Sequence, residues 1–260
     1  MKVFLVYSIE NIRGEKMYKD FAYIYDALMK DVDYEKWTSY IEAIFQSHGL
    51  KPESIVDLAC GTGGVTNILA KHGYQVTGVD ISEDMLASAR EKARKSGLRV
   101  PYICQNIINL ELHHPVDAIT CMCDGFNYIL DKQDMKSAFI KIYSYLKPGG
   151  LLVFDISSYY KLSSVLGNNI MADTGEDISL IWYNKFIKKD NTLEMNLTFF
   201  IKEGNYYKRS DETHLQKAYQ QDEIIELLTE CNFTNVTCLS PFSMTPPQKR
   251  SQRIFFTAVK

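Results

Sequence analysis

The sequence predicts an α/β protein with a Rossmann-like, doubly wound and mostly parallel sheet, a helical N-terminal lid and an inserted antiparallel β meander. Three observations predict this fold: strands alternate with helices over residues 54–156, the first strand runs into a glycine-rich turn at residues 61–64, and strict apolar alternation begins near residue 193. The 260 residues, 46% hydrophobic and 23% charged, are enough for one large domain with an insert.

Residues 1–50 are expected to form an N-terminal extension and two lid helices. Apolar side chains recur at steps of three and four residues in two groups: Met17, Phe21, Ile24, Tyr25 and Leu28, then Trp37, Ile41, Ile44 and Phe45. His48-Gly49 ends the second helix. Residues 1–16 precede this pattern and could be an upstream translation artefact. Their apolar run, Val3 to Tyr7, is too short for a signal sequence.

Residues 51–157 are expected to form the parallel core. Ser82 should cap a helix that Gly97 stops, and Lys147 to Gly150 should form a turn before the fifth strand. The expected strands are 54–59, 75–80, 100–104, 116–123 and 151–156, and the helices between them are 65–72, 83–96 and 134–146.

Residues 158–220 are expected to form the antiparallel insert, because Leu193, Met195, Leu197, Phe199 and Ile201 alternate strictly with polar residues. Turns are predicted at residues 189–191 and 203–205. Residues 221–260 then complete the core with a helix at 222–231, capped by Asn232, and strands at 236–239 and 254–259.

The net charge of -3 excludes a broad basic field for nucleic acid. Lys249, Arg250 and Arg253 form a local basic group in a late loop, interpreted as solvated surface with a nucleic-acid contact as the alternative. Six cysteines without a C-x-x-C pair indicate free thiols in the cytoplasm. His113-His114 and Cys104 lack metal-ligand spacing, so no metal is expected.

The glycine turn predicts a nucleoside ligand. Gly61 and Gly63 permit close backbone approach at a helix N-terminus, and Asp80 ends the next strand, where its carboxylate can bind ribose hydroxyls. Asp57 would repel a pyrophosphate but attract an ammonium and a sulfonium, which favours S-adenosylmethionine (SAM) over NAD. Two alternatives stay open: Asp57 could cap its turn through backbone N–H groups, and Ala59-x-Gly61-x-x-Gly64 imitates a dinucleotide fingerprint.

The sequence resembles the class I SAM-dependent methyltransferases. The motifs that carry the resemblance are Asp57-x-Ala59-x-Gly61-x-Gly63, Val79-Asp80-Ile81-Ser82-x-x-Met85-Leu86 and Leu146-Lys147-Pro148-Gly149-Gly150. The patterns Tyr18-x-x-Phe21-Ala22-x-x-Tyr25-Asp26 and Glu212-Thr213-His214-x-Gln216-x-x-Tyr219 narrow it to a bacterial subgroup similar to small-molecule N-methyltransferases acting on amino sugars and glycine.

The resemblance implies that SAM is the cofactor and S-adenosylhomocysteine the product. The implied cofactor residues are Tyr18, Tyr25, Asp57, Ala59, Gly61, Gly63, Asp80, Ile81, Met85, Asn106, Ile107 and Cys123. Ile81 and Met85 should sandwich the adenine, and Tyr18 and Tyr25 should close the site from above. Ala59 departs from a common family glycine, and Asn106 from a carboxylate on the adenine amino group.

The implied acceptor residues are Asp124, Asn127, Tyr128, Tyr159, Trp182 and His214. Glu212 could orient His214 as a general base, although a structural His is the alternative. Tyr159 and Trp182 could equally form the core of the insert.

The sequence thus predicts methyl transfer to an amine or hydroxyl of a small molecule by a monomer or homodimer, with no membrane. The rival functions are a tRNA or other nucleic-acid methyltransferase, a noncatalytic SAM-binding module and, remotely, a dehydrogenase.

Overall fold

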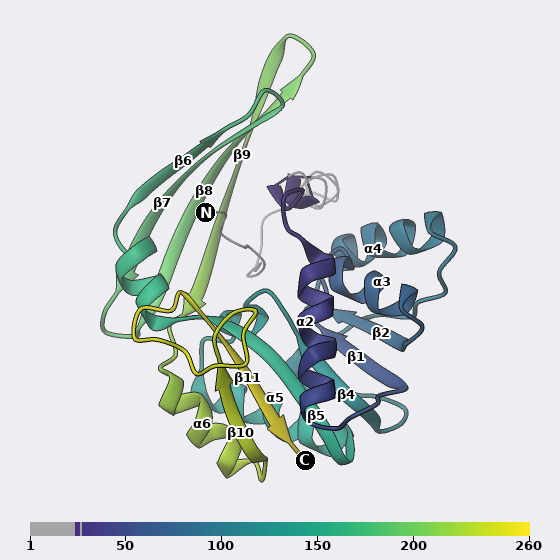
Figure 1. The fold of residues 1–260 in the computed structure, drawn as a ribbon. Helices are drawn as coiled ribbons and strands as arrows, with labels where there is room; N and C mark the ends of the chain where they lie inside the picture. Colours follow the sequence, from purple (N-terminus) through teal and green to yellow (C-terminus); the bar gives the residue numbers. More distant parts are fainter. Residues whose placement is uncertain (1–23, 27) are drawn as a thin grey trace.

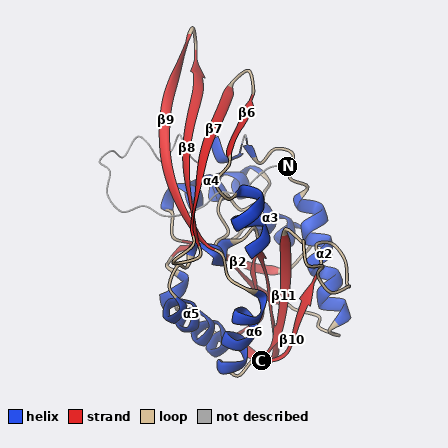
Figure 2. Ribbon diagram, turned by 90° about the vertical axis from the view of Figure 1, so that its left-hand side faces the viewer, coloured by secondary structure: helices blue, strands red, loops and turns tan. Residues whose placement is uncertain are grey.

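The computed structural model describes residues 24–26 and 28–260, which form two sheets (Figures 1 and 2). The larger sheet has seven strands in the order β10-β11-β5-β4-β1-β2-β3. Its strands are β1 Ser54–Leu58, β2 Gln75–Asp80, β3 Tyr102–Cys104, β4 Val116–Cys121, β5 Leu146–Ser157, β10 Thr234–Leu239 and β11 Arg253–Val259. β1 to β5 pair in parallel, whereas β11 runs antiparallel to both of its neighbours, β5 and β10.

Helices cover both faces of this sheet, as expected for parallel strands joined by helical crossovers. One face packs against α2 and α3 and the other against α5 and α6, in two separate apolar clusters. The helices are α2 Tyr34–Ser47, α3 Gly64–Lys71, α4 Glu83–Lys95, α5 Lys132–Tyr145 and α6 Gln221–Glu230. Three short helical turns, η1 Ile107–Asn109, η2 Gly125–Tyr128 and η3 Lys161–Leu166, follow β3, β4 and β5.

The smaller sheet is the predicted antiparallel meander, and Figure 1 shows it projecting away from the core. Its strands are β6 Ile170–Thr174, β7 Ile178–Ile187, β8 Thr192–Glu203 and β9 Tyr206–Lys217. The alternate residues that the sequence singles out in β8 are buried up to Phe199, against η3 and Ile24. Asn191 and Gly204 have positive φ in the two turns that were predicted between these strands.

Several local predictions are confirmed. The Ser82 side chain accepts a hydrogen bond from the Met85 backbone N–H and caps α4, and Asn232 follows α6 with a φ of 69°. The turn predicted at Lys147 to Gly150 is wrong in one respect. β5 already begins at Leu146, which pairs with Val116, and the register then shifts before Ala118. Residues 147–150 of β5 lie opposite Asp117 alone in β4, and Gly149 has a φ of 77°, so the predicted turn is an irregular segment inside the strand rather than a link before it.

The predicted helix at residues 17–30 and the extension at residues 1–16 lie mostly outside the described residues. Ile24 to Asp26 are helical and continue that pattern. β6 and η3 are additions that the sequence did not indicate, because the β6 residues are largely exposed and carry no apolar alternation. Over the described part of the chain, no helix is both long and apolar enough to span a membrane.

Candidate active site

The glycine turn between β1 and α3 is shaped by the side chains around it. Gly63 has a φ of 79° and lies so close to Tyr102 that an added Cβ would be 2.6 Å from its hydroxyl. A Cβ on Gly64 would lie 2.6 Å from the Tyr34 ring. Both positions therefore require glycine, the first for conformation and both for space. The Tyr34 ring consequently lies directly on the turn.

Asp57, near the end of β1, is buried below this turn. Its carboxylate accepts hydrogen bonds from the Thr66 hydroxyl at 2.6 Å and the Thr120 hydroxyl at 2.8 Å. Its partners are thus two side-chain hydroxyls, not the turn N–H groups that the capping alternative required. Burial raises the pKa of Asp57 to about 6, against the lowering effect of the two hydroxyls.

Asp80, the last residue of β2, connects the turn to α4. Its carboxylate accepts from the Gly61 N–H at 2.8 Å and from the Ser82 N–H at 2.9 Å. Burial raises the pKa of Asp80 to about 7, and the backbone N–H groups oppose this shift. A carboxylate has about four lone-pair positions, so Asp80 keeps room for a further hydrogen bond beside these backbone N–H groups.

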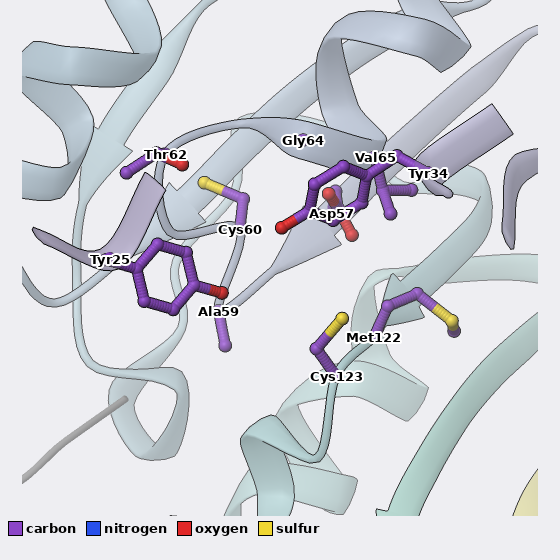
Figure 3. A pocket seen from close by; sticks show the side chains of 10 residues that line it. All are labelled: Tyr25, Tyr34, Asp57, Ala59, Cys60, Thr62, Gly64, Val65, Met122 and Cys123. Atoms are coloured by element: carbon purple, nitrogen blue, oxygen red, sulfur yellow. The ribbon is translucent and has the colours of Figure 1, made fainter. Parts of the chain in front are cut away.

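Two neighbouring cavities open at this edge of the sheet. The smaller one, shown in Figure 3, lies among Tyr25, Tyr34, Asp57 and Cys123. The larger one has a volume of about 830 Å³, and its lining includes Asp80, Ile81, Asn106, Ile107 and Tyr128. Ala59 lines both cavities. A volume of this order is typical of small-molecule sites. No lysine or arginine is among the described residues that line either cavity.

The loop after β4 is held in an unusual conformation beside the smaller cavity. Cys123 and Asp124 have φ values of 61° and 57°. The Asp155 carboxylate accepts from both of their backbone N–H groups, at 2.7 and 3.1 Å. Arg253 donates to Asp155 and, at 2.9 Å, to Asp124. A buried ion network therefore fixes a backbone that two non-glycine residues seldom adopt.

Comparison with known proteins agrees with this arrangement. Residues 55–150 match the model of a methyltransferase domain. A relative from Geobacillus sp. (strain WCH70), whose name places it among the methyltransferases, is 37% identical over 245 residues, which cover 94% of this chain and 99% of the relative. The chain belongs to the class I SAM-dependent methyltransferases.

Solved structures support the same assignment. A SAM-dependent methyltransferase from Clostridium acetobutylicum is 37% identical, with a TM-score of 0.86 over 94% of this chain and 99% of that one. The sugar N-methyltransferase KedS8 from Streptoalloteichus shares the fold, with a TM-score of 0.76 at 18% identity over 100% and 98% of the two chains. The chain is therefore an enzyme, and it has the fold of the SAM-dependent methyltransferases.

Most residues expected at the cofactor lie around the two cavities of the methyltransferase. Tyr25, Asp57, Ala59 and Cys123 line the smaller one, while Asp80, Ile81, Asn106 and Ile107 line the larger one, again with Ala59. The Asn106 amide oxygen accepts from the Ile108 N–H at 3.0 Å. Gly61 and Gly63 form the turn but line neither cavity. Tyr18 lies outside the described residues.

Met85 lies elsewhere. It is buried against Tyr25 and Met29, in a small cluster between α4 and the N-terminal helix, and it lines neither cavity. From the sequence motif one can predict that Met85 faces inward on α4. The motif gives no sign that Tyr25 and Met29 cover this side chain. In this arrangement Ile81 lines the larger cavity and Met85 does not, so Met85 is not placed to contact an adenine there.

The expected acceptor residues divide into two groups. Tyr128 lines the larger cavity, and its ring lies 6.2 Å from the ring of His214. His214 is buried, and its Nε2 lies 2.9 Å from a Glu212 carboxylate oxygen, so the expected pair is formed. Tyr159 and Trp182 pack in the apolar cluster of the insert. The rings of both side chains therefore contribute to the core of the insert.

Asp124 and Asn127 are structural rather than free to face a ligand. Asp124 is bonded to Arg253, Ser157 and Gln216, and the Asn127 amide donates to the Lys217 carbonyl oxygen at 2.8 Å. Both side chains are fully buried. The reading of Arg253 as solvated surface is wrong for the same reason, since this side chain is buried between Asp124 and Asp155.

Sequence reasoning missed Tyr34 and Asp26. Tyr34 lines the smaller cavity, and Asp26 accepts hydrogen bonds from the Thr62 hydroxyl at 2.6 Å and from Lys92 at 2.8 Å. Asp26 stands in the quoted N-terminal pattern, but nothing in the sequence indicates its partners. Among the residues that the structure describes, no three His, Cys, Asp or Glu side chains gather as a metal site.

Proposed function

We propose that the enzyme binds SAM in the two cavities and transfers its methyl group to an amine or hydroxyl of a small-molecule acceptor in the cytoplasm, leaving S-adenosylhomocysteine. One observation carries this proposal: the cavities combine Asp57 and Asp80 with apolar walls, and their described lining has no lysine or arginine. Such a lining favours a ligand with a sulfonium and an ammonium and disfavours the pyrophosphate of NAD.

The chain's own residues would share the work as follows. Asp80 would bind the ribose, Ile81 and Ile107 would contact the adenine, and Asp57 would lie near the charged end of the cofactor. SAM supplies an electrophilic methyl group when it is bound. Tyr25 and Tyr34 would exclude water from the transfer site, because both side chains line the smaller cavity. Burial raises the pKa values of both phenols above their usual range, so both stay neutral.

A small acceptor is supported by the insert and by the charge distribution. The insert stands above the carboxyl ends of the parallel strands, where ligands of α/β sheets bind (Figure 1). Of the three late basic residues, Arg253 is buried in ion pairs, so only Lys249 and Arg250 are exposed for a phosphate backbone. The fold is similar to that of a sugar N-methyltransferase, and this analogy also favours a small acceptor.

The test has two parts. Calorimetry with SAM, S-adenosylhomocysteine and NAD should detect binding of the first two only. Methyl-labelled SAM should then be incubated with total tRNA and with a small-molecule filtrate of a bacterial lysate, at low and moderate salt. We expect label in the filtrate. Strong labelling of tRNA that falls steeply with salt would contradict the small-molecule proposal, and tight SAM binding without any transfer would favour a noncatalytic module.

A further inference from the structure

Three buried side chains on one face of the insert carry polar atoms that have no hydrogen-bond partner among the described residues. These atoms are Trp182 Nε1, Asn184 Nδ2 and Oδ1, and Gln216 Oε1. Trp182 is 7% exposed, and Asn184 and Gln216 are 0% exposed. A buried polar group without a partner destabilises the folded protein, so native proteins rarely keep several of them together. Their grouping indicates a binding surface for a polar ligand.

Strand register places the three side chains on the same face. Asn184 in β7 is paired with Met195 in β8, which is paired with His214 in β9. Trp182 lies two residues before Asn184, and Gln216 lies two residues after His214, so each keeps the same orientation as its neighbour. Strand spacings of roughly 4.8 Å and rises of about 3.4 Å per residue place Asn184 and Gln216 roughly 12 Å apart, a span that suits a small metabolite.

This face meets the loop beside the smaller cavity. The Gln216 amide donates to the Asp124 carboxylate at 3.2 Å, and Asp124 follows Cys123, which lines that cavity. The contact between the Tyr128 and His214 rings joins the same face to η2. A molecule held on this face would therefore lie close to the proposed site of methyl transfer.

The charge of the face restricts the ligand. Residues paired across β7, β8 and β9 form rows, and three of these rows point inward on this face. They are Trp182–Leu197–Glu212, Asn184–Met195–His214 and Phe186–Leu193–Gln216. None is a lysine or arginine. Glu212 is bonded to His214, and nearby Asp124 is paired with Arg253. The buried cations near the face, Arg253 and Lys161, are bonded to Asp124 and to Ser157, so among the described residues no cation on the face itself is available to an anionic group.

We propose that Trp182, Asn184 and Gln216 bind the methyl acceptor, a neutral or positively charged small molecule with both hydrogen-bond donors and acceptors. This inference rests on the proposed function and names the class of its acceptor. The Trp182 N–H and the Asn184 amide N–H groups donate to a hydroxyl or carbonyl oxygen of the acceptor. The Asn184 and Gln216 oxygens accept from its hydroxyl or amine groups.

The experiment compares the wild type with Asn184→Leu, Trp182→Phe and the control Asn196→Leu. Asn196 lies on the opposite face of β8, and its amide is bonded to Glu194 and Thr213. Each protein is measured for S-adenosylhomocysteine affinity, for melting temperature, and for transfer of labelled methyl from SAM into a small-molecule filtrate of a bacterial lysate, whose products are separated by charge.

We expect Asn184→Leu and Trp182→Phe to keep cofactor affinity within about twofold and to lose transfer about tenfold or more. Asn184→Leu should also melt at the same temperature or about 2–4 °C higher, because it removes an unpaired buried amide. Asn196→Leu should melt lower and transfer normally. Trp182→Phe removes a single N–H and keeps the ring, so it tests the proposal even if Asn184→Leu does not fold.

Three results would overturn the inference while leaving the proposed function intact: unchanged transfer by both variants, an equal loss of cofactor affinity, or wild-type label confined to anionic products. A wild type that binds S-adenosylhomocysteine but labels nothing in the filtrate would overturn the proposed function and this inference together.

Discussion

At the scale of single residues, Asp80 both holds the glycine turn, through the Gly61 N–H, and is the residue proposed to bind the ribose of SAM. We expect Asp80→Ala to lower SAM affinity at least about tenfold, because each hydrogen bond from a ribose hydroxyl to the carboxylate is worth about 1.5–3 kcal/mol. Isothermal titration calorimetry measures this directly. Glu91→Ala, on the exposed surface of α4, is the control and should bind normally. Equal affinity in the two variants would remove Asp80 from the site.

Asp57 should make SAM affinity depend on pH. Its pKa of about 6 is raised by burial, so in the free protein this carboxylate contributes stability below its unfolded pKa near 3.8, and that contribution is lost as pH rises through about 6. A sulfonium nearby favours the ionised form. SAM affinity should therefore rise as pH increases through about 6, more than the affinity for S-adenosylhomocysteine, which lacks the sulfonium charge.

Asp57→Asn should flatten this difference between the two ligands. Calorimetric titrations between about pH 5 and about pH 8 provide the comparison, and the same variant separates Asp57 from Asp80, whose pKa of about 7 also lies in this window. A SAM preference that keeps its full pH dependence in Asp57→Asn would assign the effect to another group.

At the scale of elements, the N-terminal helix is attached to the cofactor turn through Asp26. This side chain binds Thr62 in the turn and Lys92 in α4, while Tyr25 beside it lines the smaller cavity. We expect added SAM to slow amide hydrogen exchange over residues 24–34, and Asp26→Asn to reduce that protection because it weakens the bond to Lys92. Exchange measured by mass spectrometry decides. Equal protection in both proteins would show that the Asp26 bonds to Thr62 and Lys92 do not hold the N-terminal helix on the cofactor turn.

The elements themselves could be predicted where the signal is local. Ser82 caps α4, the glycine turn follows β1, and the alternation at Leu193 to Phe199 defines β8, because each depends on neighbours within a few residues. Tyr34 on Gly64 and the Asp155–Arg253 pair are long-range contacts, 98 positions apart in the second case, and no periodicity encodes them. The sequence offered Trp182 either as an acceptor residue or as insert core, and no local pattern could show what covers its side chain.

At the scale of the whole molecule, Arg253 connects the last strand to the site. We expect Arg253→Met to lower the free energy of unfolding by about 3–5 kcal/mol, because it leaves the Asp124 and Asp155 carboxylates buried without their cation. Urea denaturation measures this change. Arg250→Met, at an exposed position three residues earlier, should change stability by less than about 0.5 kcal/mol. Similar small effects in both variants would show that the ion network contributes little.

The position of β11 also constrains how the chain can fold during synthesis. This last strand lies inside the sheet, between β5 and β10, and brings Arg253 to the loop that borders the smaller cavity. While β11 is still inside the ribosome, β5 has an open edge and β10 has no partner, so the nascent chain exposes strands that can pair wrongly. The loop after β4 receives its cation only once β11 has been made and has paired with β5, so the sheet and this border of the smaller cavity are completed together.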